Sequence, residues 1–234
     1  MKKKLLEFVN GFFSLLFPET CKKCGNELLG KEDIICRKCI SDLPRTNFEK
    51  DRQNPVAQLF WGKIPINYAF SIFYFRKGET VQKLIHLLKY KKNRKAGAIL
   101  GKIAGNIIKE MTFVPEIDFI VPVPLHPKKL RIRGYNQCEV LAKSISKSTG
   151  IAVNSDVLIR SIYNVSQTKK GKYERWQNVE GIFNVTNSKL FEGKHIMVID
   201  DIITTGSTLE ACCYSLSKIP NIRISVIGMA YSAI

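Results

Sequence analysis

The sequence predicts an α/β protein in which a parallel sheet is flanked by helices and preceded by a small four-cysteine module. Two observations carry this prediction. Short apolar runs rich in β-branched residues alternate with runs of helical periodicity over residues 67–234, as in βαβ units. Four of the seven cysteines form two C-x2-C pairs close to the N-terminus. The length of 234 residues suits one α/β domain and one small module.

Residues 1–17 are predicted to form an amphipathic helix, because apolar residues recur at helical spacing and Pro18 ends the pattern. The basic start resembles a signal peptide, but Glu7 and Asn10 interrupt the apolar run and no small-x-small cleavage site follows. The run is also too short to cross a membrane. Packing on the body of the protein and weak contact with a membrane surface both stay open as roles. We expect a cytoplasmic protein without a transmembrane segment.

The cysteine pairs lie in a predicted module at residues 18–47. Two C-x2-C pairs separated by eleven residues suit one tetrahedral zinc ion, and four thiolates leave no open position for catalysis. The alternatives are two disulfides, which need an oxidising compartment, or a redox C-x-x-C pair, which needs a βαβ context. The sequence therefore predicts a structural zinc site formed by Cys21, Cys24, Cys36 and Cys39.

Residues 48–66 are polar and proline-spaced, which predicts a linker to the domain at 67–234. Within that domain, apolar and aromatic runs predict strands at 68–76, 117–121, 151–159, 194–199 and 222–229. Helical periodicity predicts helices at 79–89, 96–111, 137–148 and 208–218. Gly101 and Gly105 share one face of the second of these helices, which indicates close packing there.

The segment that follows the strand at 117–121 is rich in prolines and cations. Three prolines predict a stiff turn at the carboxyl end of the strand, and four cations follow within the six residues 128–133. Arg131 and Arg133 belong to this group, and arginine binds phosphate oxygens by two parallel hydrogen bonds. A solvated basic turn is the alternative.

The net charge of +17 favours anionic partners such as nucleic acid, nucleotides, pyrophosphate or an anionic membrane surface. Part of it is concentrated in a basic block at 89–95. Residues 164–180 carry further cations, Arg175 among them, without apolar periodicity. That composition predicts a surface loop that closes over a ligand.

Residues 196–209 hold the most specific pattern in the chain. A buried strand is followed by Asp200 and Asp201, then by a loop of small residues that leads into a helix. Carboxylates accept hydrogen bonds from vicinal hydroxyls, and N–H groups at a helix N-terminus bind phosphate. A capping box formed by Ser207 and Glu210 is the alternative for part of the loop. The loop residues are Thr204, Thr205, Gly206, Ser207 and Thr208.

Residues 196–209 resemble the phosphoribosyl-pyrophosphate (PRPP) loop of type I phosphoribosyltransferases. Pro-Val-Pro-Leu-His at 122–126 and Arg-x-Arg-Gly-Tyr-Asn-Gln at 131–137 resemble the ComF family of competence-associated phosphoribosyltransferase-like proteins. Ser166-Gln167, Arg175-Trp-Gln-Asn178 and Gly181-Ile-Phe183 extend this resemblance. Lys129 departs from the family pattern, in which an arginine is expected. Lysine keeps the positive charge but cannot form two parallel hydrogen bonds to one phosphate.

The resemblance implies a type I phosphoribosyltransferase-like sheet with PRPP, Mg²⁺ and a structural Zn²⁺ as ligands. Asp200 and Asp201 would bind the ribose hydroxyls, and residues 204–208 the 5′-phosphate. Pyrophosphate would lie against Pro122, Val123 and Pro124, with Arg131 and Arg133 nearby. Arg175 of the closing loop would also bind PRPP. The residues implied in catalysis are Asp200, Asp201, Arg131 and Arg133.

Three functions follow as hypotheses. The first is a PRPP-dependent transferase in DNA uptake or nucleotide salvage. The second is an accessory protein that binds single-stranded DNA and competence-machinery proteins. The third is a PRPP or nucleotide sensor without turnover. No motif identifies the acceptor base, and no residue stands out as its general base.

Overall fold

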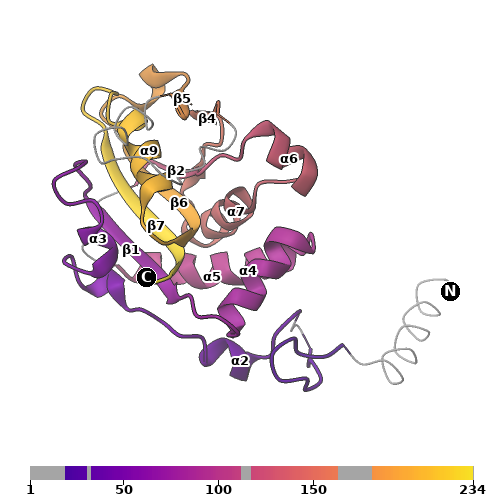
Figure 1. Ribbon diagram of the computed structural model, residues 1–234. Helices are drawn as coiled ribbons and strands as arrows, with labels where there is room; N and C mark the ends of the chain where they lie inside the picture. The colour runs from indigo at the N-terminus through magenta and orange to yellow at the C-terminus, as the bar shows by residue number, and fades with distance from the viewer. Residues whose placement is uncertain (1–18, 31–32, 112–116, 163–180, 234) are drawn as a thin grey trace, which may run out of the picture. The chain divides into compact units, whose positions relative to one another are not determined.

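A computed structural model describes residues 19–30, 33–111, 117–162 and 181–233 (Figure 1). The chain divides into two compact units with the boundary between Pro44 and Arg45. The predicted helix at 1–17 and the predicted closing loop at 164–180 lie outside the described residues. Over the ranges that are described, no helix combines the length and apolarity needed to cross a membrane.

The N-terminal unit contains the cysteine pairs. Its described elements are an antiparallel bridge between Thr20 and Glu27 and the short helix α2, Arg37–Ser41. Its small core holds Ile34 and Ile35 together with two of the cysteines.

The second unit is built on a five-stranded sheet (Figure 1). Its strands lie in the order β1-β7-β6-β2-β3, and every adjacent pair is parallel. Their bounds are Tyr68–Tyr74, Arg223–Tyr231, His195–Ile203, Phe119–Pro122 and Ala152–Val153. The first five residues of β6 are all buried, as expected for a central strand that is covered on both faces. The predicted parallel sheet is confirmed.

Helices α4 (Thr80–Tyr90), α5 (Arg94–Glu110) and α7 (Gln137–Thr149) pack together beside the sheet (Figure 1). A Cβ atom on Gly101 would lie 2.5 Å from Cβ of Ser144, so α5 and α7 approach closely because the glycine has no side chain. The predicted close packing is confirmed. A fourth helix, α9 (Ser207–Leu216), follows β6 and packs on it.

The proline-rich segment after β2 differs from the predicted turn. It forms a helix, α6 (Pro127–Arg133). His126 caps this helix, because its Nδ1 accepts a hydrogen bond from the Lys128 N–H at 3.2 Å, and Pro127 stands at the first helical position, where no N–H is needed. Gly134 ends the helix in the left-handed conformation.

Two further segments differ from the predictions. The extended stretch 151–159 is divided between β3 and β4 (Leu158–Arg160), and β4 pairs with β5 (Phe183–Val185) in a separate antiparallel sheet. Residues 48–66 form more than a linker, since they contain the helical turns η1 (Phe48–Lys50) and α3 (Pro55–Gln58) and bury three apolar side chains in the core. A last turn, η2 (Ser188–Phe191), precedes β6. The apolar residues buried from 48–66 are Val56, Phe60 and Ile64.

Candidate functional site

The acidic pair lies near the carboxyl end of β6. Oδ1 of Asp200 accepts hydrogen bonds from the Asp201 N–H at 2.8 Å and from the Cys138 thiol of α7 at 3.4 Å. Asp201 is 4% exposed, and its Oδ1 lies 2.8 Å from Nζ of Lys89 on α4. Its other oxygen, Oδ2, is buried without a hydrogen-bond partner among the described residues. The two adjacent carboxylates therefore have different surroundings.

The electrostatics of the pair follow from this packing. Burial raises the pKa of Asp200, and the negative charge of Asp201 raises it further, to about 7. Burial also raises the pKa of the Cys138 thiol well above its usual value, and the charges of Asp200 and Asp201 add to this effect. Cys138 is therefore a neutral donor to Asp200 at neutral pH.

The predicted phosphate loop joins β6 to α9. Gly206 is buried and left-handed, with φ at +76°, and stands immediately before the helix. A Cβ atom there would lie 3.4 Å from Cβ of Leu59. The side-chain oxygens of Thr205 and Ser207 lie 2.8 Å apart, while Thr204 and Thr208 are exposed.

The capping box that was the alternative for this loop does not form. The N-cap is Gly206, which has no side chain, and the Ser207 N–H at the first helical position donates a long hydrogen bond of 3.5 Å to Oγ1 of Thr205. Glu210 instead pairs with Lys63, with 3.1 Å between Oε2 and Nζ. Ser207 therefore does not cap the first turn of α9, whose N–H groups are the donors that a phosphate site uses.

A pocket opens beside the phosphate loop, with a volume of about 280 Å³. Arg160 of β4 lines it together with three loop residues, and this arginine was not predicted as a site residue. The other lining residues are Ile182, Phe183, Thr205, Ser207, Thr208 and Ala211.

The segment Pro122–Pro124 lies beside the end of β6. The Val123 N–H donates a hydrogen bond to the Ile199 carbonyl at 2.9 Å. Asn136 then links this segment to α7, because its Nδ2 donates to the Val123 carbonyl at 3.0 Å and its Oδ1 accepts from the Cys138 N–H at 3.0 Å. The structure therefore brings two predicted site segments, 122–124 and 200–208, to the same edge of the sheet.

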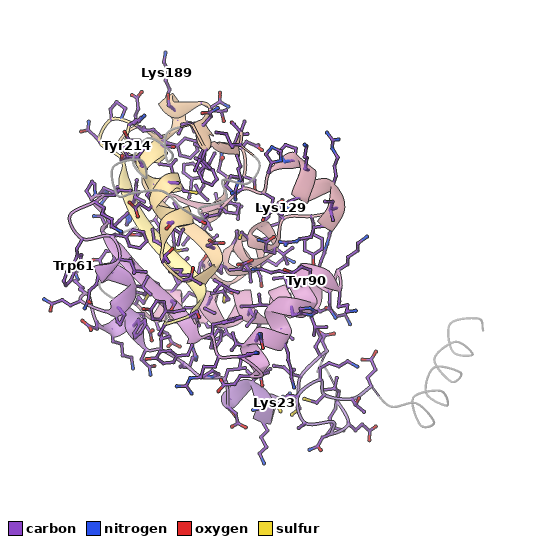
Figure 2. The ribbon with its side chains drawn as sticks, viewed as in Figure 1. Lys23, Trp61, Tyr90, Lys129, Lys189 and Tyr214 are labelled. Atoms are coloured by element: carbon purple, nitrogen blue, oxygen red, sulfur yellow. The ribbon has the colours of Figure 1, made fainter. Side chains whose placement is uncertain are left out.

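Several cations gather at this edge. One of them is Lys129 on α6 (Figure 2). Burial lowers the pKa of Lys129, and the positive charges of Arg160, Arg133 and Lys89 lower it further. These four cations come from three elements, α4, α6 and β4. Arg133 is half-buried, whereas Arg131 is exposed. Such a group attracts an anionic ligand.

The four cysteines of the N-terminal unit come together as predicted. All seven cysteines of the chain are free, and the sulfur atoms of Cys21, Cys24, Cys36 and Cys39 lie within 4.8 Å of one another. Burial raises the pKa of the Cys21 thiol, but N–H groups of Cys24, Cys36 and Lys23 outweigh it and lower the pKa to about 6. Four thiols at this spacing fit a tetrahedral zinc ion.

A second group of possible ligand atoms lies within 4.8 Å at the sheet edge, and consists of Cys138, Asp200 and Asp201. It fits a hard Mg²⁺ ion poorly, because the Cys138 thiol is protonated and Lys89 already pairs with Asp201. The acidic pair suits hydroxyl groups better. A Mg²⁺ ion at this edge would be held mainly by the phosphate oxygens of a substrate.

Lys89, Cys138 and Arg160 lie at the candidate site and were not predicted from the sequence. Lys89 was assigned only to the basic block at 89–95, and Cys138 only to packing. Arg160 carries no local signal, since it follows an ordinary strand pattern. Arg175 and the Ser166-Gln167 pair lie outside the described residues.

Comparison with known proteins gives a partial match. No family model matches the chain. It is 33% identical over 114 residues to competence protein F of Haemophilus influenzae, covering 48% of this chain and 50% of that protein. It is 28% identical over 129 residues to the DNA utilization protein YhgH of Salmonella typhi, covering 54% of this chain and 56% of that protein. The chain thus spans about half the length of these curated relatives.

Among solved structures, adenine phosphoribosyltransferase from Leishmania donovani matches 68% of this chain and 83% of its own, with a TM-score of 0.41 and 10% identity. Values this low carry no functional assignment. The sequence relatives carry more weight: over about half of its length, the chain is a homologue of competence protein F and of YhgH.

Proposed function

We propose that this protein binds PRPP at the carboxyl end of β6 and acts as a phosphoribosyltransferase of the ComF type. One observation carries the proposal. The half-buried Asp200 and the buried Asp201 stand near the end of β6, separated by two residues from the loop 204–208, and this loop leads into a helix whose N-cap is a glycine. Carboxylates that can accept hydrogen bonds from sugar hydroxyls therefore lie close in the chain to N–H groups that can donate to a phosphate.

The assignments to PRPP follow from the chemistry of each group. Asp200 and Asp201 take the ribose 2′- and 3′-hydroxyls. Residues 204–208 and the first N–H groups of α9 take the 5′-phosphate, and Arg160 contributes charge to the same pocket. The pocket beside the loop, lined by hydroxyl groups and one arginine, supports this assignment.

The pyrophosphate lies between residues 122–124 and the cations of α6. Lys129, Arg131 and Arg133 stabilise the negative charge that develops as the C1–O bond breaks and pyrophosphate takes the electron pair. The acceptor then forms a bond to C1, which has gained oxocarbenium character, and loses a proton. A Mg²⁺ ion held by the phosphate oxygens of the substrate would neutralise further charge on the leaving group. Arg175 stays a predicted contact.

The biological setting is proposed from the relatives. One carries competence in its name and the other DNA utilization. We place the reaction in DNA uptake or in the salvage of nucleotides, in the cytoplasm, with a structural Zn²⁺ in the N-terminal unit.

Calorimetry with PRPP and Mg²⁺ tests the site. Binding should be abolished by Asp200→Asn together with Asp201→Asn, because both hydroxyl acceptors lose their charge. Asp118→Asn is the matched control, since Asp118 lies just before β2, at the amino end of the sheet, and pairs with Lys194. Equal affinity in the double variant and the wild type would refute the assignment.

Turnover is tested by pyrophosphate release from PRPP over a panel of nucleobases. Release with one base identifies an enzyme and its acceptor. Tight binding without release from any base identifies a sensor instead.

A second function, binding of single-stranded DNA, is favoured by a basic and aromatic patch at the end of α4 and on α6. Tyr90 is 64% exposed, and the Arg133 guanidinium lies 5.7 Å from its ring centre (Figure 2). Ile132 on α6 is 77% exposed, and Lys91 and Lys92, which follow Tyr90 in the basic block, are exposed as well. Aromatic stacking beside cations is typical of sequence-tolerant strand binding. A gel-shift series in salt tests it: Tyr90→Ala should weaken binding, and absence of a shift at low salt would eliminate this function.

A further inference from the structure

We propose that Lys89 is a positioning residue of the acidic pair. Its ammonium group pairs with Oδ1 of Asp201 and keeps the Asp201 side chain directed into the protein. Asp200 is then the carboxyl that contacts a ligand hydroxyl first. The proposal rests on the sugar-phosphate site described above, and assigns the two carboxylates different roles.

The first support is the fixed place of Lys89. The residue before it, Leu88, is fully buried, and its carbonyl accepts a hydrogen bond from the Tyr135 hydroxyl. Tyr135 lies two residues before α7, so this bond ties the end of α4 to the start of α7. The Lys89 side chain is 19% exposed, and its ammonium group reaches Asp201 from this anchored backbone.

The second support is that the two carboxylate oxygens of Asp201 differ in their partners. Oδ1 has the ammonium group at 2.8 Å, whereas Oδ2 has no partner among the described residues. A buried carboxylate in this state depends on Lys89, its one cation among the described residues, because loss of the partner of a buried charge is strongly destabilising. Without Lys89, Asp201 would take up a proton or turn outward, and either change alters the pair.

The third support is the exposure of the partner carboxyl. Asp200 is half-buried, and Oδ1 is held by the Asp201 N–H and the Cys138 thiol. The positive charge of Lys89 lowers the pKa of Asp200, against the larger effects of burial and of Asp201 that raise it. Lys89 thus acts on Asp200 through both geometry and charge.

The alternative role for Lys89 is direct contact with phosphate, and sugar analogues separate the two. Ribose 5-phosphate and 2,3-dideoxyribose 5-phosphate carry the same phosphate and differ in the hydroxyls. We expect Lys89→Met to weaken ribose 5-phosphate binding by about 10- to 100-fold, the range for a hydrogen bond to a charged group, and to leave the dideoxy compound within about 3-fold. Lys89→Arg should restore most of the discrimination. An equal loss for both compounds would overturn the proposal.

Lys194→Met is the matched control, since Lys194 also pairs with an aspartate, Asp118 at 3.1 Å, but at the amino end of β6. It should leave both affinities unchanged. If Lys89→Met fails to fold, addition of Asp201→Asn should restore folding, because the unpaired buried charge is gone. A double variant that also fails to fold would contradict the proposal.

A ligand-free measurement separates this proposal from the proposed function. The side-chain ¹³C signal of Asp200 should titrate near pH 7 in the wild type and at a different pH in Lys89→Met. The shift is to higher pH if Asp201 keeps its charge, and to lower pH if Asp201 takes up a proton. If neither sugar phosphate binds the wild type while this shift occurs, the proposed function fails and the role of Lys89 toward the pair stands. An unchanged titration overturns the role of Lys89.

Discussion

The Cys138 thiol donates a hydrogen bond to Oδ1 of Asp200 over 3.4 Å, and this contact joins α7 to the carboxyl end of β6. It satisfies one carboxyl oxygen without supplying positive charge. Asp200 therefore remains a carboxyl whose charged form is disfavoured by burial and by Asp201.

The first prediction concerns stability against pH. The pKa of Asp200 is about 7 in the folded protein and about 3.9 in an unfolded chain, so the folded state binds the extra proton between these values. Stability from this group is complete below the unfolded value and is lost as pH rises to about 7. Asp200→Asn should therefore raise the free energy of unfolding at pH 8, by about 2–4 kcal/mol, and change it little below pH 4.

Urea unfolding at several pH values measures this effect. Asp118→Asn provides a control of opposite sign. A hydrogen bond from the His195 N–H, together with Lys194, lowers the pKa of Asp118. Its replacement should destabilise the protein at neutral pH. A loss of stability in Asp200→Asn at pH 8 would contradict the assigned burial of this carboxyl.

The second prediction concerns the packing of α5 on α7. Gly101→Ala should destabilise the protein by about 1–3 kcal/mol, since the added methyl group would lie 2.5 Å from Cβ of Ser144 and 2.8 Å from the Leu141 carbonyl oxygen. Lys102→Ala, on the exposed face of the same helix, should have little effect. Thermal unfolding measures the melting temperature of each variant against the wild type. If Gly101→Ala melts at the wild-type temperature, α7 moves away from α5 without cost and the prediction is wrong.

The third prediction concerns zinc. Protein purified under reducing conditions should carry about one Zn²⁺ per chain, because four thiols converge on one position. Cys36→Ser should lower the zinc content, and Cys213→Ala should not, since Cys213 is buried in α9 of the other unit. Elemental analysis gives the ratio. Metal-free wild-type protein would rule out the zinc site.

The fourth prediction concerns Arg160. Arg160→Met should weaken ribose 5-phosphate binding by about 10-fold, because the pocket beside residues 205–208 loses its arginine. Lys189→Met removes a charge from the exposed turn η2 and serves as the control (Figure 2). Calorimetry at fixed ionic strength compares the two. Equal affinities would exclude Arg160 from the phosphate pocket.

The strands and the acidic loop were predictable because their signals are local. Short apolar runs and helical periodicity indicate which side chains face the core. Strands β1, β2, β6 and β7 lie where the apolar runs predict them. Parallel strands place their carboxyl ends at one edge, so the segments after β2 and β6 had to meet there. The spacing of the cysteines likewise predicted their convergence.

Local patterns in the sequence predict the parallel sheet, the acidic pair with the loop that follows it, and the four-cysteine group. The packing of distant segments sets which cation pairs with Asp201, which arginine lines the pocket beside residues 205–208, and that residues 48–66 contribute to the core. These contacts could not be predicted because they join residues that are far apart in the sequence. Lys89 and Asp201 are far apart in sequence and have no shared periodicity, so only the packing of α4 and α7 beside β6 brings them within 2.8 Å.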